Sequence, residues 1–227
     1  MNERSNSASD DGETCWTLIH SAANGSAVAT NQFAIRYEPI LRKSLRCRWT
    51  DPRRMRLIDD AIQEILIECI RPGGVLAKAN SECPGGFRAF LYGVTRNVMR
   101  RFESSPDWHS ISVQDPAVDE SSLGKVFDRE FARAVMKEAS LLQHRIAELQ
   151  GPAALRRVEL LRARFHDDLS IREIAKRWSV EPAWLHHEYA RARDEFRDAL
   201  LNIIRTQQPM ATDAENEVTC RQLLGLL

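Results

Sequence analysis

The chain has 227 residues and a mass of 25.9 kDa, and its 32 basic and 32 acidic side chains give a formal net charge of zero. Hydrophobic residues make up 43% of the sequence, enough for a core, so the composition excludes a disordered charged tail, a collagen and a disulfide-rich mini-protein. At roughly 100–200 residues per domain, the length allows one domain or two small ones.

Neither a membrane span nor a secretion signal is expected. No apolar run approaches the roughly 18 residues of a transmembrane helix, and residues 1–13 are polar and acidic. We therefore expect a cytoplasmic protein without membrane insertion. The five cysteines are scattered and form no C-x-x-C pair, which predicts reduced, mostly buried thiols and no metal site. They are Cys15, Cys47, Cys69, Cys83 and Cys220.

The zero net charge conceals two basic blocks. Residues 31–105 carry 14 basic against 8 acidic side chains, and residues 125–205 carry 16 against 13, whereas the remaining segments are acidic overall. Basic blocks suit a polyanion, usually nucleic acid, and the alternative is a pair of ordinary solvated surfaces.

Helical spacing dominates the chain and no segment alternates strictly, so we expect an all-α protein of two helical domains. A Pro-, Ser- and acid-rich stretch between them predicts a flexible linker. The expected parts are a disordered N-terminus at 1–13, a helical domain at 14–103, an acidic linker at 104–124, a second domain at 125–205 and a tail at 206–227 with a short amphipathic helix.

The first predicted helix of interest spans residues 58–70. At about 100° per residue its apolar side chains form one face, with Asp60, Gln63 and Glu64 opposite. Ile67 falls on the polar side between them. An apolar residue framed by two carboxylates and an amide is typical of a small protein-binding patch, and the alternative is a lone exposed apolar residue.

The helix predicted at residues 86–102 also has two faces. An apolar stripe of Phe87, Phe90, Leu91, Val94 and Val98 predicts its core side. The other side carries Arg88, Tyr92, Arg96 and Arg100 at intervals of four residues. Arginines with an interleaved tyrosine can hold phosphates and stack on a base, and the alternative is a solvated cationic helix face.

Residues 169–199 predict two helices separated by a tight turn. Ser170 and Glu173 form a capping-box pattern, the first helix ends near residues 178–179, and Pro182 suits the first turn of the second helix. In that helix His187 and Arg191 point away from the expected core side. This pattern favours a helix-turn-helix over a generic helical hairpin.

In this order, the segments resemble an extracytoplasmic-function sigma factor of bacterial RNA polymerase over about residues 14–205. FAIRYEPIL resembles the opening helix of the family's region 2, and IDDAIQEILIE its D-x-x-Q-E segment. GGFRAFLYGVTRNVMRR resembles the F-R-x-W/F-L…A-R-N…R segment, and LSIREIAKRWSVEPAWLHHEYARARDEFRDAL the region 4 helix-turn-helix.

The resemblance implies a non-enzymatic initiation factor that binds core RNA polymerase and promoter DNA, with no cofactor. It implies that the polymerase-binding residues are Asp60, Gln63, Glu64 and Ile67. It implies contacts to the −10 element, which such proteins melt, through Lys78, Asn80, Arg88, Tyr92, Arg96, Asn97, Arg100 and Arg101. It implies contacts to the −35 element through Ala183, Trp184, His186, His187, Arg191 and Arg193. An anti-sigma factor or another regulator is a further partner that the family resemblance allows.

Three features depart from the family pattern. Trp184, His186, His187 and Glu188 stand where small or basic residues are usual. Residues 125–151 add a long helix, and residues 213–227 add a tail that either packs on region 4 or binds a partner.

The competing function is a helix-turn-helix regulator whose first domain is sensory or dimerising. An enzyme is disfavoured, because the histidines form no ligand-spaced cluster and no phosphate-binding loop is present.

Overall fold

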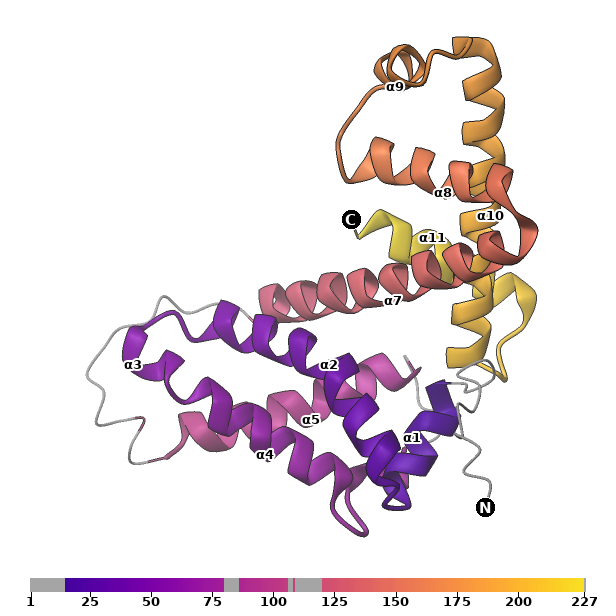
Figure 1. Cartoon of the computed structure of the whole chain (residues 1–227). Helices are drawn as coiled ribbons and strands as arrows, with labels where there is room; N and C mark the ends of the chain where they lie inside the picture. The colour runs from indigo at the N-terminus through magenta and orange to yellow at the C-terminus, as the bar shows by residue number, and fades with distance from the viewer. Residues whose placement is uncertain (1–14, 80–85, 106–107, 109–119, 227) are drawn as a thin grey trace, which may run out of the picture. The chain divides into compact units, whose positions relative to one another are not determined.

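In the computed structural model the described part of the chain is all-helical, which confirms the expected fold class (Figure 1). The structure describes residues 15–79, 86–105, 108 and 120–226. These residues divide into two compact units, one ending at Phe131 and the other beginning at Ala132. Residues 206–210 belong with the first unit and residues 211–227 with the second.

The first unit is built from helices of very different length. They are α1 (Cys15–Ala23), α2 (Ala27–Arg48), α3 (Pro52–Met55), α4 (Ile58–Ile70), the 3-10 helix η1 (Val75–Lys78), α5 (Gly86–Glu103) and the first part of α7 (Glu120–Gln150). Helix α2 packs against α1 and α4, and α4 packs against α5. Ser26 caps α2 by accepting a hydrogen bond from the Ala29 amide, which satisfies one of the free donors at the helix start.

An aromatic cluster holds the centre of this unit together. The Phe87 ring of α5 lies 5.2 Å from Tyr37 and 6.1 Å from Phe33, both of α2, and 6.0 Å from Trp16 of α1. All four side chains are buried. Edge-on and tilted ring contacts at these separations add to the free energy of burial, so the cluster fixes α5 against α1 and α2.

The second unit contains the remainder of α7, α8 (Pro152–Phe165), α9 (Ile171–Trp178), α10 (Pro182–Gln207, up to Arg205) and α11 (Asp213–Gly225). Its core brings together Leu160 of α8, Ile174 and Ala175 of α9, and Leu185 of α10. The Gln143 side-chain amide donates to the Ala192 carbonyl oxygen at 3.1 Å, so a buried hydrogen bond ties α7 to α10.

The predicted boundaries of α9 and α10 are confirmed. Ser170 accepts from the Glu173 amide while the Glu173 carboxylate accepts from the Ser170 amide, which completes the capping box. Hydrogen bonding of the Glu173 carboxylate to the Ser170 side chain, and then to the Ser170 amide, lowers the pKa of Glu173. Ser179 ends α9 in the left-handed region at φ 53°, and Pro182 opens α10.

The predicted linker and second domain differ from the structure at their shared boundary. Helix α7 already begins at Glu120, inside the expected linker at 104–124, and residues 125–131 belong to the first unit rather than the second. The physical reason is a stripe of buried apolar side chains at four-residue spacing, namely Leu123, Phe127 and Phe131. Most of the expected linker, at 106–107 and 109–119, and the expected disordered N-terminus lie outside the described residues.

The tail helix packs within the second unit. Cys220 and Leu223 of α11 are buried, and Arg197 of α10 contacts the Glu217 carboxylate at 2.6 and 2.7 Å. A second pair joins Arg205 to Asp213 at 2.9 Å. Of the two roles considered for the tail, packing is therefore the one present here, and the expected short helix is confirmed at Asp213–Gly225.

Candidate protein-binding face and nucleic-acid interface

Helix α4 presents the polar face that its sequence predicts. Ile58, Ala61, Ile62, Ile65 and Cys69 are buried, whereas Asp60 and Gln63 are exposed and Ile67 is 50% exposed. A shallow groove beside this face runs between α2 and α4 and is lined by Thr30, Arg42, Ile62, Gln63, Ile67 and Ile70. The apolar floor and its charged borders suit a protein partner better than a small polar ligand.

The acidic residues of this face have different surroundings. Glu64 accepts a hydrogen bond from Arg101 of α5 at 3.3 Å, and the same guanidinium also pairs with Glu68. Asp59 pairs with Arg42 at 2.7 Å. Asp60 and Gln63 form no such contact with the described residues, so they and Ile67 are the ones free to meet a partner. Arg101, a predicted −10 contact, joins α5 to α4 in this structure.

The first half of the predicted basic stripe of α5 contacts the start of α7. Arg88 forms an ion pair with Asp128 of α7, and the Tyr92 ring lies 5.3 Å from the Phe127 ring. Gly124 of α7 also lies next to Tyr92, where a Cβ atom would make an ordinary contact with the hydroxyl oxygen at 3.7 Å. The Phe131 ring stacks 6.4 Å from Tyr37 beyond this contact.

The second half of the α5 stripe is more open. Asn97 and Arg100 are exposed, Arg96 is half-buried, and Lys78 of η1 is exposed. Asn80 lies outside the described residues. The predicted −10 residues thus form an accessible group toward the end of α5 and a group near its start that contacts α7.

The predicted −35 residues all lie on exposed positions of α10. Ala183, Trp184, His186, His187, Arg191 and Arg193 are exposed, while Leu185 and Ala192 on the opposite side are fully buried. Arg191 pairs with Glu188 at 3.6 Å, and the Arg193 guanidinium lies 5.7 Å from the Tyr189 ring. This one-sided burial leaves a continuous outward face rich in cations and aromatic rings.

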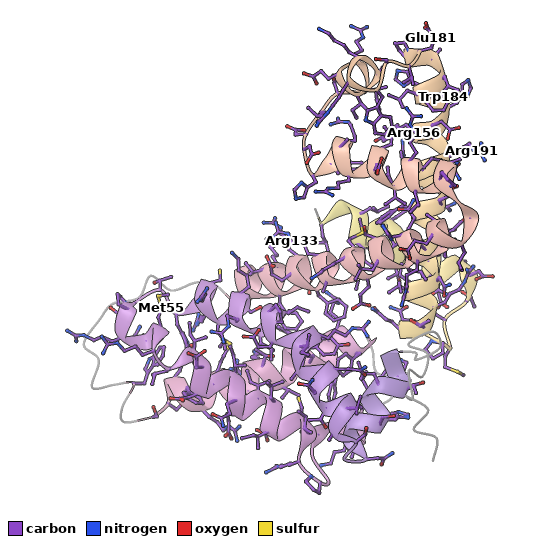
Figure 2. The ribbon with its side chains drawn as sticks, viewed as in Figure 1. Met55, Arg133, Arg156, Glu181, Trp184 and Arg191 are labelled. Atoms are coloured by element: carbon purple, nitrogen blue, oxygen red, sulfur yellow. The ribbon has the colours of Figure 1, made fainter. Side chains whose placement is uncertain are left out.

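One arginine beside this face was missed by sequence reasoning. The Arg156 guanidinium of α8 lies 5.0 Å from the Trp178 ring centre and 5.6 Å from the Trp184 ring centre (Figure 2). Within the described part of the chain it forms no hydrogen bond and no ion pair. No local pattern indicated this residue, because its two partners follow it by 22 and 28 positions.

Its neighbour Arg157 is held by carboxylates instead. The Arg157 guanidinium is almost fully buried and pairs with Glu195 at 2.6 Å and Glu188 at 3.4 Å, both of α10. The hydrogen bond with Glu195 is the main cause of its raised pKa. Arg157 thereby joins α8 to α10 and offsets part of the negative charge of two carboxylates next to the exposed face.

Nothing in the described residues indicates a metal centre or a membrane segment. No group of three histidine, cysteine or acidic side chains there is placed to hold a metal ion. No described helix has the length and apolar character to cross a membrane. Cys47, Cys69 and Cys220 are free thiols, and burial raises the pKa of Cys69 to about 12, which makes that thiol unreactive.

Comparison of the chain with protein-family models, with curated proteins and with solved structures found no match.

Proposed function

We propose that this protein is a sigma factor of the extracytoplasmic-function type, which binds bacterial core RNA polymerase and directs it to promoters. The proposal rests on the resemblance of four segments in the family's order. In the first unit the candidate polymerase face on α4 is solvent-exposed at Asp60, Gln63 and Ile67.

The observation that carries DNA binding is the outward face of α10. A buried side of leucine and alanine fixes the helix, and the six candidate contacts to the −35 element all face solvent. The preceding helix α9 and residues 179–181 complete a helix-turn-helix, whose second helix enters the major groove in proteins of that type. The basic side chains supply attraction to phosphate, and the imidazole rings supply contacts to base edges.

The engaged start of α5 favours one alternative, a helix-turn-helix regulator whose first unit has another task. Melting a −10 element requires Arg88 and Tyr92 to meet DNA, and both contact α7 here. A sigma factor would have to release this contact when the polymerase binds, whereas a regulator would not.

Reconstitution separates the two functions. The full-length chain is mixed with bacterial core RNA polymerase, and transcription is measured from a library of genomic promoter fragments. Specific transcripts that share −35 and −10 elements are the expected result. Binding to duplex DNA without association to the polymerase would exclude the sigma factor and leave the regulator.

A further inference from the structure

We propose that Arg156 is a phosphate-binding residue, held ready by Trp178 and Trp184 for the backbone of a duplex lying along α10. This inference rests on the proposed DNA binding of α10 and adds to it a residue from a different helix. The ligand is the phosphodiester backbone, so the contact is independent of base sequence.

Arg156 lies against the side of α10 that carries Trp184. Trp184, Glu188 and Glu195 lie within about 40° of one another around the helix axis, at about 100° per residue. Helix α8 contacts all three, Trp184 through Arg156 and the two carboxylates through Arg157. This side borders the outward face that carries His187 and Arg191, and Figure 2 shows Arg156, Trp184 and Arg191 in this part of the unit.

The two indole rings hold the guanidinium without using its hydrogen-bond donors. A guanidinium stacked on an aromatic face keeps its planar fork of N–H groups free, and this fork matches the oxygens of a phosphate. Arg156 is exposed and has no ion pair among the described residues, so its charge is uncompensated. Glu159 lines the groove beside Arg156 and Trp178 but does not pair with the arginine.

Pre-ordering explains why an unpaired arginine would be held in this way. A flexible arginine loses rotamer entropy when it binds a phosphate, whereas a side chain already fixed between two rings loses less. The adjacent Arg157 weakens the opposing effect, because its single charge offsets part of the negative charge of Glu188 and Glu195, and Arg191 also pairs with Glu188.

The test measures the salt dependence of binding to a mixed-sequence duplex and to a second, unrelated duplex. Full-length wild-type chain, Arg156→Ala and Arg162→Ala are compared, since Arg162 is an exposed arginine of the same helix. Losing one phosphate contact is expected to reduce the slope of log K against log salt by about 0.9. Arg156→Ala should show this loss equally on both duplexes, while Arg162→Ala keeps the wild-type slope.

A double-mutant cycle with Trp178→Leu tests the role of the rings. If Trp178 acts by holding Arg156, its replacement weakens binding in the wild-type background and has no further effect in Arg156→Ala, with circular dichroism confirming the fold. The proposal would be overturned if Arg156→Ala kept the wild-type salt slope. It would also be overturned if Arg162→Ala lost as much of the slope, or if Arg156→Ala lost it on one duplex only. Absence of duplex binding by the wild-type chain would instead reject the DNA-binding function itself.

Discussion

Arg156 and Arg157 are consecutive residues of one helix with opposite surroundings. Arg157 is buried and pairs with two carboxylates, whereas Arg156 is exposed and lies close to two indole rings. Successive positions on an α-helix point about 100° apart, so the two arginines meet different side chains on the same side of α10. Residue type alone therefore does not separate a structural arginine from one available to a ligand.

Replacing Arg157 by alanine is expected to destabilise the second unit. The change removes charged hydrogen bonds to Glu195 and Glu188 and leaves both carboxylates without their shared cation, at a cost of about 1.5–3 kcal/mol. Chemical denaturation followed by circular dichroism measures this free energy. Arg162→Ala is the control, since an exposed arginine without an ion pair among the described residues should change stability by about 0.5 kcal/mol or less. Equal stabilities for the two variants would show that the Arg157 network is not stabilising.

At the scale of elements, the first turns of α7 are part of the first unit. Phe127 is fully buried, and it contacts Tyr92 while Asp128 pairs with Arg88. A segment expected to be linker and start of the second domain thus covers one end of the candidate −10 helix. The contact is built from an aromatic pair and an ion pair.

Phe127→Ala is expected to loosen this contact. Deleting a fully buried phenylalanine side chain costs about 3–5 kcal/mol, through lost burial and the cavity left behind. Amide hydrogen exchange should become faster in the first half of α5, where Tyr92 loses its ring partner and the adjacent Arg88–Asp128 ion pair is loosened. Leu149→Ala on the same helix is the control, since Leu149 is 90% exposed. Unchanged exchange over α5 would mean that the start of α7 does not stabilise it.

These elements also separate what the sequence predicts from what it does not. Periodicity places the buried side of α4 and most of that of α5, where Phe90 is only half-buried, and capping chemistry places the boundaries of α9, because both depend on neighbours within a few residues. Whether a polar side chain on a helix surface is paired within the protein depends instead on residues far away in the sequence. Arg88 meets Asp128 and Arg157 meets Glu195, pairs 40 and 38 positions apart, and helical spacing holds no information about such contacts.

At the scale of the whole molecule, the proposed function needs two surfaces that belong to different units. The α4 face is a candidate for protein and the α10 face for DNA, and a sigma factor must use both to bring a polymerase to a promoter. One basic block, residues 31–105, lies in the first unit, and most of the other, residues 125–205, lies in the second. A regulator would need only the second surface, so the α4 face decides between the two functions.

Ile67→Arg is expected to abolish most of the affinity for core RNA polymerase. Ile67 is half-exposed at the edge of the groove between α2 and α4, and truncating or charging a central interface residue costs about 2 kcal/mol or more, roughly 30-fold in affinity. Asp60→Lys tests the same face by reversing a charge. Its effect is easier to interpret than that of a change at Glu64, because Glu64 also pairs with Arg101.

Affinity is measured by titrating labelled full-length protein with core polymerase. Leu149→Arg is the matched control, since it places the same charge on an exposed apolar position of the second unit. If Ile67→Arg and Asp60→Lys both bound core polymerase with wild-type affinity, the α4 face would be an ordinary solvated helix surface and not a polymerase-binding site. Duplex binding through α10 would be unaffected by that result, and the protein would then be a DNA-binding regulator in which the first unit has a separate role.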